Sequence, residues 1–285
     1  MLPTFVIGLR EGLEAALIVG VVAAFLGQHG NRQALRQVWI GTALAVAICA
    51  AVAVALDIVS SSLPHPQQEG LETVVGAIAV AMVSYMVLWM RSHARDLRGE
   101  LERAAGSAVA SGSSRALVLM AFLAVLREGF ETAVFLLATF NEGHNVVASA
   151  SGAFLGVLVA AALGYGIYRG GVRINLSRFF RITGIVLVVI AAGLVMTALH
   201  TAAEAGWLTI GQQPALDLAW LVRPGTLVEP LLSGVLGIQP HPVWIEVIGW
   251  LAYLIPMLVC VALPRRAGRR TQGARIADTG GAQGA

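Results

Sequence analysis

Seven runs of about twenty apolar residues recur along the chain, separated by polar or arginine-rich segments. A run of this length crosses a hydrocarbon core of about 30 Å as a helix. The chain is 57% hydrophobic and 12% charged, which is more apolar than the average soluble protein. No alternating ten-residue pattern indicates a barrel. We therefore predict an all-α polytopic membrane protein with seven transmembrane helices. The predicted spans are residues 2–27, 38–60, 71–90, 116–140, 146–168, 179–203 and 243–263.

Arginines in the connections predict the orientation. The sequence has no lysine, and sixteen of its 19 arginines lie in alternate connections, whereas the opposite connections hold only Arg223. The positive-inside rule then places the N-terminus outside the cell and the C-terminus in the cytoplasm. We expect a multi-pass protein of the cytoplasmic (plasma) membrane. Arginines in such positions contact anionic lipids. The net charge of +3 therefore indicates membrane lipids as partners and no nucleic acid.

An Arg-Glu-Gly-x-Glu motif occurs twice, at residues 10–14 in the first span and at residues 127–131 in the fourth. These two spans have opposite predicted directions, so helices one to three and four to six would form an inverted 3+3 repeat, followed by one additional helix. The predicted segments are 1–90, the first three-helix repeat; 91–115, a cytoplasmic loop; 116–205, the second repeat; 206–242, an extracytoplasmic loop; 243–264, the seventh helix; and 265–285, a disordered cytoplasmic tail.

Both motifs are predicted to lie near the middle of the membrane. Arg10 is eight residues, or about 12 Å, from the outer start of its span, and Arg127 is eleven residues, or about 17 Å, from the inner start of the fourth. At about 100° per residue, the arginine and both glutamates of each motif share one helix face. The motif glycines, Gly12 and Gly129, are expected to let these two helices approach each other closely.

Six charged residues at this depth are costly, at about 2.5–3.5 kcal/mol each. We therefore expect them to face one another and a hydrated cavity, with Arg10 and Arg127 paired to Glu14 and Glu131 four residues later. Four glutamates against two arginines leave two negative charges, which suits a cation. The predicted metal ligands are Glu11, Glu14, Glu128 and Glu131. The alternative interpretation is a pair of interhelical salt bridges that serve assembly.

Further acidic residues are predicted at the outer ends of the third and sixth spans. Glu69 and Glu72 begin the third span, and His200 and Glu204 lie one helical turn apart near the end of the sixth. Together they could attract a cation to an entrance site. The alternative is that they are solvated caps of helix ends. Glu246 lies near the outer start of the last span, and this boundary position gives no reason to assign it to the site.

Paired Arg-Glu-Gly-x-Glu motifs in the first and fourth of seven helices resemble the oxidase-dependent iron transporter family, which comprises the high-affinity iron permeases of fungi and the ferrous iron permeases of bacteria. The third- and sixth-span patterns are similar to further acidic sites of that family. The resemblance implies that the motif glutamates are iron ligands and that iron is a transported substrate, with no permanent cofactor. It also implies extracytoplasmic partner proteins that oxidise or deliver iron.

The sequence thus predicts an iron permease that holds its ion between the two motifs and is not an enzyme. Alternatives stay open, because carboxylates suit Fe³⁺ and also Mn²⁺, Mg²⁺ or Ca²⁺, and they also form proton relays. A transporter of another divalent metal or of protons is the first alternative. A membrane-embedded enzyme is the second, although no histidine-rich or serine or cysteine nucleophile arrangement favours it. A subunit with a purely structural role is the third.

Overall fold

The computed structural model describes residues 1–28, 30, 32–93, 114–140, 146–168, 175–218, 220, 232 and 236–263. Each of the seven predicted spans coincides with a helix, and the only β pairing among these residues is one isolated bridge between Pro214 and Val243. The all-α prediction is confirmed. The predicted tail 265–285 and most of the predicted loop 91–115 lie outside the described residues. The helices are α1 (Leu2–Gln28), α2 (Arg32–Ser62), α3 (His65–His93), α5 (Ser114–Phe140), α6 (Val146–Tyr168), α7 (Leu176–Glu204) and α9 (Trp244–Ala262).

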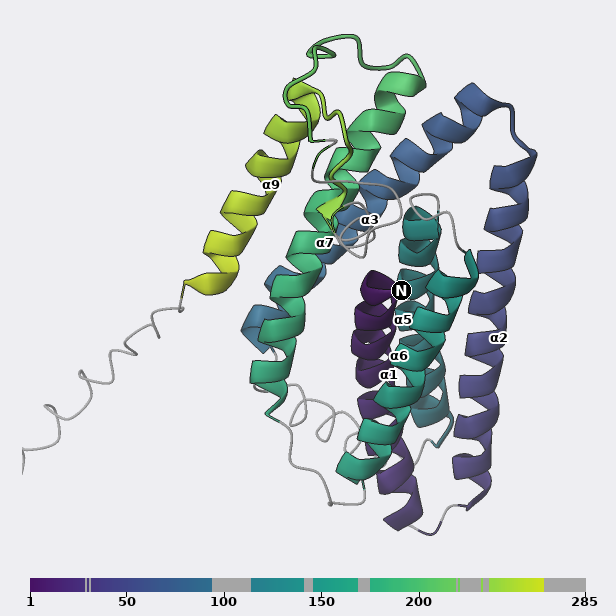
Figure 1. Ribbon diagram of the computed structural model, residues 1–285. Coiled ribbons are helices and arrows are strands. Elements are labelled where there is room, and N and C mark those ends of the chain that lie inside the picture. The colour runs from purple at the N-terminus through teal and green to yellow at the C-terminus, as the bar shows by residue number, and fades with distance from the viewer. Residues whose placement is uncertain are drawn as a thin grey trace, which may run out of the picture.

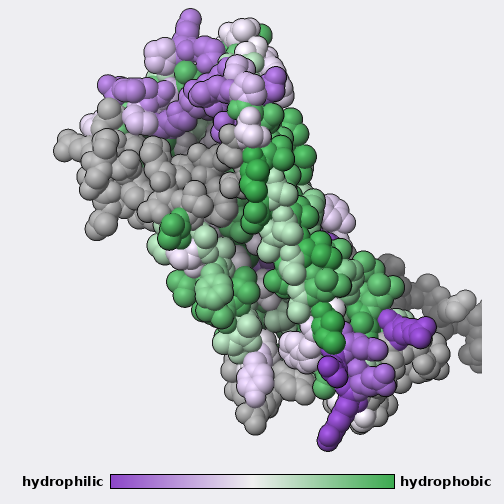
Figure 2. Space-filling model, turned by 90° about the vertical axis from the view of Figure 1, so that its right-hand side faces the viewer, coloured by the Kyte–Doolittle hydropathy of each residue, from purple (hydrophilic) through white to green (hydrophobic). Residues whose placement is uncertain are grey.

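The outer surface of the helix group is apolar. Large hydrophobic side chains on α2, α6 and α9, such as Leu44, Phe154 and Ile255, are exposed. Figure 2 shows a broad hydrophobic band with hydrophilic residues gathered at its two ends. Five helices (α2, α3, α6, α7 and α9) are long and apolar enough to cross a membrane. The remaining two, α1 and α5, have 27 residues each and carry the charged motifs. Such surfaces are stable in lipid and costly in water, so the chain is a multi-pass membrane protein.

The helices pack in three main pairs. Helix α1 lies along α6, α2 along α5, and α3 along α7, while α9 packs mainly on α7 (Figure 1). The pairs are joined because α1 and α5 also contact each other, and α5 contacts α3. Successive helices run in alternating directions (Figure 1). Helices α1 and α5 are therefore antiparallel neighbours in the middle of the molecule.

The motif glycines allow close packing, but not between the helices that the sequence predicted. A Cβ atom at Gly12 would lie 2.9 Å from the Cβ of Ala160 in α6, and one at Gly129 would lie 2.6 Å from the Sγ of Cys49 in α2. Both distances are too short for a real side chain. Gly12 and Gly129 thus bring α1 against α6 and α5 against α2, and the prediction that they bring α1 and α5 together is wrong.

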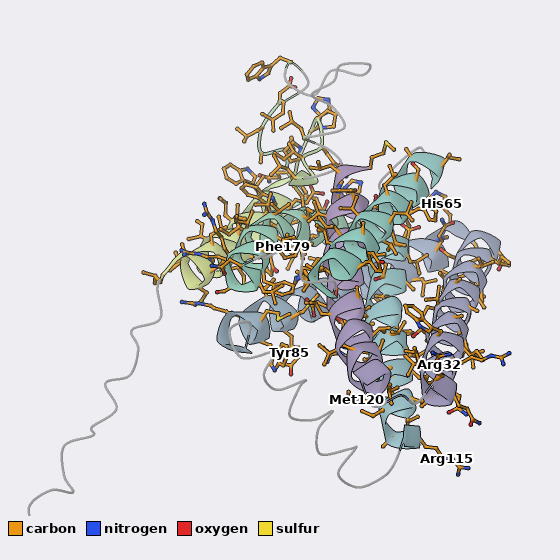
Figure 3. The ribbon with its side chains drawn as sticks, turned by 90° about the horizontal axis from the view of Figure 1, so that it is seen from below. Arg32, His65, Tyr85, Arg115, Met120 and Phe179 are labelled. Carbon is orange, nitrogen blue, oxygen red and sulfur yellow. The ribbon has the colours of Figure 1, made fainter. Side chains whose placement is uncertain are left out.

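Charges are divided between the two ends of the helix group. Outside the motifs, the arginines of the described residues lie where α2, α5 and α7 begin and where α3 ends; they are Arg32, Arg36, Arg91, Arg115, Arg178 and Arg181. Figure 3 shows Arg32 and Arg115 on the outer sides of α2 and α5. Arg91 and Arg181 donate hydrogen bonds to the last carbonyl groups around the end of α9. The opposite end holds Glu69, Glu72, Glu204 and Glu246.

Candidate metal centre

The two motifs meet because of their positions in two antiparallel helices. Glu11 follows the first residue of α1 by nine positions, and Glu131 precedes the last residue of α5 by nine. At 1.5 Å per residue, each lies about 14 Å from the end of its helix on the same side of the molecule. Helices α1 and α5 are in contact, so the motif side chains of one face those of the other.

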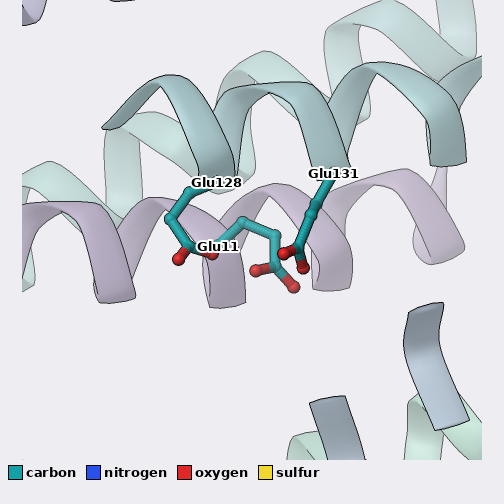
Figure 4. Close-up of side chains that lie close together, drawn as sticks. All are labelled: Glu11, Glu128 and Glu131. Carbon is teal, nitrogen blue, oxygen red and sulfur yellow. The ribbon is translucent and has the colours of Figure 1, made fainter. Parts of the chain in front are cut away.

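Three carboxylates converge at this crossing. One ligand oxygen each of Glu11, Glu128 and Glu131 lies within 4.8 Å of the other two (Figure 4). Glu11 and Glu128 are buried and Glu131 is half-buried. Among the described residues this is the only group of three His, Cys, Asp or Glu side chains that lie close enough to share a metal ion. The crossing of α1 and α5 therefore creates an acidic centre from both motifs.

The fourth motif glutamate is not part of this group. Glu14 lies 3.4 Å from Nε of Arg10, an ion pair that is almost fully buried. In the second motif, Nε of Arg127 donates a hydrogen bond of 2.9 Å to Oε1 of Glu131. Glu14 is still close enough to interact electrostatically with Glu128 and Glu131. It contributes negative charge to the centre while its carboxylate is directed to Arg10.

Most of the buried side-chain polar atoms that lack a hydrogen-bond partner belong to the two motifs. Eight buried side-chain nitrogen and oxygen atoms have no hydrogen-bond partner among the described residues, and six of them belong to motif residues. They are the three guanidinium nitrogens of Arg10, one oxygen each of Glu11 and Glu128, and Oε1 of Glu14. Buried polar atoms without a partner are rare and costly, and a bound ion is one of the ordinary explanations. The oxygens of Glu11 and Glu128 are thus available for a cation, whereas Oε1 of Glu14 faces Arg10.

A small cavity adjoins two of the three carboxylates. Glu11 and Glu131 line it together with apolar side chains of α3, α5 and α7, and its volume is ≈ 10 Å³. This is about the space that one water molecule requires. An ion that entered the cavity would have to lose most of its hydration shell, because there is no room for a complete one.

The predicted entrance residues come together at the end of the molecule opposite the arginines. Glu69 and Glu72 at the start of α3 are close enough to Glu204 at the end of α7 to interact electrostatically. Near these residues, a hydrogen bond of 2.8 Å between the hydroxyl groups of Thr73 and Thr201 joins α3 to α7. His200 lies 3.5 Å from Oε1 of Glu204. All four predicted residues thus belong to one acidic region.

Sequence reasoning did not identify Glu246 as a member of this region. It lies in the first turn of α9, is 1% exposed, and its Oε1 lies 2.8 Å from Nδ1 of His200. Its other oxygen accepts a hydrogen bond from the backbone N–H of Val243. A cavity of ≈ 420 Å³, lined by His200, Glu204 and Glu246 among others, opens here. In the sequence, Glu246 follows an apolar loop without a motif, and only its position as an acidic residue within a membrane helix could have indicated a role.

The chemistry of the centre favours a cation with oxygen ligands. Carboxylates are hard ligands that bind Fe³⁺, Mn²⁺, Mg²⁺ and Ca²⁺. With every group ionised, the four glutamates outnumber the two arginines and leave two negative charges, which would attract a cation and oppose an anion. The three converging carboxylates by themselves do not distinguish one of these metals from another.

Comparison with known proteins identifies the family. Residues 1–273 match the model of the Iron permease FTR1 family. The chain is 40% identical over 270 residues to the ferrous iron permease EfeU of Shigella sonnei strain Ss046 and equally to that of Escherichia coli O157:H7, covering 94% of this chain and 98% of each relative. It is 38% identical over 279 residues to the ferrous iron permease EfeU of Yersinia pestis, covering 97% and 98%. No solved structure matches significantly. The chain therefore belongs to the iron permease FTR1 family.

Proposed function

We propose that this protein imports iron across the cytoplasmic membrane through a site that its two Arg-Glu-Gly-x-Glu motifs form together. The main support for this proposal is that one carboxylate oxygen each of Glu11, Glu128 and Glu131 lies within 4.8 Å of the other two. It places three carboxylates from two transmembrane helices around one point, and intramembrane charge of this kind usually marks an ion pathway. The choice of iron as the substrate is supported by the relatives that are named ferrous iron permease.

An inverted repeat would explain how the site opens to each side in turn. The packing supports it, since α1 on α6 and α5 on α2 are equivalent pairs if α1 corresponds to α5 and α2 to α6. The glycine contacts follow the same exchange, with Gly12 against α6 and Gly129 against α2. Segments 1–90 and 116–205 would then rock against each other around the site, while α9 is an addition to the second segment.

Iron would enter at the acidic end. Glu69, Glu72, His200 and Glu204 line this entrance in our proposal, and Glu246 joins them through its contact with His200. The arginines at the opposite end support an orientation with the N-terminus outside and the C-terminus in the cytoplasm. The acidic end would then face the extracytoplasmic side, where partner proteins that oxidise or deliver iron could hand over the ion.

The proposal is tested by uptake of radiolabelled iron into proteoliposomes that contain the purified protein. We expect Glu128→Gln and Glu131→Gln to lower the initial rate by about 100-fold, because each removes one charged ligand from a three-ligand site. Asp217→Asn is the matched control, since Asp217 is an exposed carboxylate (77% of its side chain) outside the helices. Wild-type rates in both glutamine variants would exclude the site.

Competition distinguishes iron from the alternative substrates. Uptake of labelled iron is measured with increasing unlabelled Fe²⁺, Mn²⁺ or Mg²⁺, and a pH-sensitive dye inside the vesicles reports protons. We expect unlabelled iron to compete at the lowest concentration. A protein that moves protons or Mn²⁺ readily but not iron would contradict the proposed substrate and leave the site itself in place.

A further inference from the structure

We infer that two methionines of α3, Met82 and Met86, form a thioether wall beside the carboxylate centre and favour Fe²⁺ over Mg²⁺ and Mn²⁺. This inference rests on the proposed function, because it concerns which ion the same site accepts. It gives the centre a specificity that its glutamates lack.

The two methionines share one cavity with the carboxylates. Met82 and Met86 line the ≈ 10 Å³ cavity whose wall includes Glu11 and Glu131. They are four residues apart in α3, so their side chains lie on the same face of that helix. Met86 is buried and Met82 is half-buried. Helix α3, which carries neither motif, thus contributes two methionine side chains to the wall of the cavity.

Sulfur changes which metals the site can hold. Mg²⁺ and Ca²⁺ take oxygen ligands, and Mg²⁺ also gives up its water reluctantly. Fe²⁺ binds more tightly than Mn²⁺ to a given set of ligands and accepts softer donors. In a cavity with room for about one water molecule, a thioether can replace a lost water ligand of Fe²⁺. It cannot do so well for Mg²⁺, which would be left with too few ligands.

The position of the methionines adds a second effect. The rest of this cavity wall is made of apolar side chains, including Val83 and Phe135. These side chains offer no oxygen to an ion that has shed its water. Among the described side chains that line this cavity, the carboxylates and the two thioethers would therefore be the only donors to a metal ion, which makes the contribution of sulfur large.

A role limited to packing makes a different prediction. Leucine is similar to methionine in volume, and a Met→Leu exchange usually costs less than about 1.5 kcal/mol. If Met82 and Met86 only fill space, their replacement by leucine leaves selectivity unchanged. If their sulfur atoms select the ion, leucine preserves the fold and removes the selection. The Met82→Leu/Met86→Leu double variant separates these two roles.

The experiment measures Fe²⁺ uptake into proteoliposomes under reducing conditions while Mg²⁺ or Mn²⁺ is added. Because the double variant loses two proposed donors to Fe²⁺, we expect the Fe²⁺ concentration that gives half-maximal uptake to rise about tenfold when no competitor is present. The Mn²⁺ or Mg²⁺ concentration that halves uptake is expected to fall about tenfold, which corresponds to about 1.4 kcal/mol. Met90→Leu is the matched control: Met90 is buried one turn further along α3 but packs against Leu13, Leu17 and Phe180 rather than lining the cavity.

A second measurement does not depend on transport. X-ray absorption at the iron edge of the purified, Fe²⁺-loaded protein is expected to contain a sulfur scatterer in wild type and in Met90→Leu, and to lose it in the double variant. The inference is overturned if Mn²⁺ and Mg²⁺ compete equally well in the double variant and in wild type, or if the iron in wild type has oxygen ligands alone. In either case, iron uptake by wild type still supports the proposed function. Absence of iron uptake by wild type overturns both.

Discussion

The two Arg-Glu-Gly-x-Glu motifs have the same sequence but different surroundings. In α1, Arg10 is completely buried, and its guanidinium makes no hydrogen bond to any described residue. In α5, the side chain of Arg127 is 55% exposed and donates a well-formed hydrogen bond to Glu131. The difference arises from packing, because α1 lies between α5 and α6 and also contacts α2 and α7.

The two motifs therefore contribute differently to the acidic centre. The first motif is a fixed, buried part of the protein, in which Arg10 balances Glu14 and leaves Glu11 to the shared centre. The second motif contributes both of its glutamates to the centre and keeps its arginine at the surface. Two identical sequences are therefore not equivalent ligand sets, and mutations at matching positions are expected to have different effects.

The largest difference is expected between the two arginines. Arg10→Ala leaves the buried Glu14 without its partner, which costs about 3–5 kcal/mol. Arg127→Ala removes a partly exposed pair, for which about 0–1 kcal/mol is typical. Thermal unfolding of both variants in the same detergent measures the difference. Equal losses of stability in the two variants would contradict the difference between the two motifs. Should Arg10→Ala fail to accumulate, Arg10→Lys and Arg127→Lys are compared instead. Arg10→Lys is expected to unfold at the lower temperature, because only Arg10 is fully buried.

A smaller difference is expected between two glutamates of the first motif. Glu11→Gln removes a member of the converging group, so we expect iron uptake to fall by about 100-fold, whereas Glu14→Gln acts through charge alone and is expected to cost about tenfold. Initial rates of uptake at matched protein density in the membrane give the ratio. If Glu14→Gln proved as damaging as Glu11→Gln, the centre would include all four glutamates during transport.

The smallest effects are expected at the motif glycines. Gly12→Ala and Gly129→Ala each insert a methyl group into a closely packed contact, at a cost of about 1–3 kcal/mol. Gly129→Ala meets only the side chain of Cys49, so Cys49→Ala in the same protein is expected to restore part of the lost stability. Gly20→Ala serves as control, because a Cβ atom there would meet nothing within 4 Å. Thermal unfolding that shifts equally in Gly20→Ala and Gly12→Ala would contradict the close packing of α1 on α6.

Much of the fold could be predicted from the sequence. The seven helices were predictable because apolar runs must be helical in lipid, where every backbone group needs an internal partner. That charged side chains such as Glu11 and Glu131 lie close together could be predicted as well, since isolated charges at this depth are too costly. The partners of Gly12 and Gly129 could not be predicted, because a small residue permits close packing with any neighbour and does not name one.

The site was predictable only in part, for a similar reason. Helical periodicity assigns Glu14 to the same face as Glu11, but whether its carboxylate turns to Arg10 or to the centre depends on side-chain geometry across two helices. Glu246 and the two methionines are ordinary residues of apolar segments in the sequence. They come to line the two cavities only because α9 packs against α7 and α3 packs against α5.

The amino-acid sequence alone was enough to assign this chain to a membrane as a set of helices and to locate two repeated motifs that bring charge into it. Composition and local periodicity are sufficient for that, because transfer into lipid depends on each segment alone. Which three carboxylates meet, which arginine is buried, and which side chains line the adjoining cavity became known from the packing of the helices. These depend on contacts between helices that are distant in sequence, and packing with atomic fit is a property of pairs of surfaces that no single segment contains.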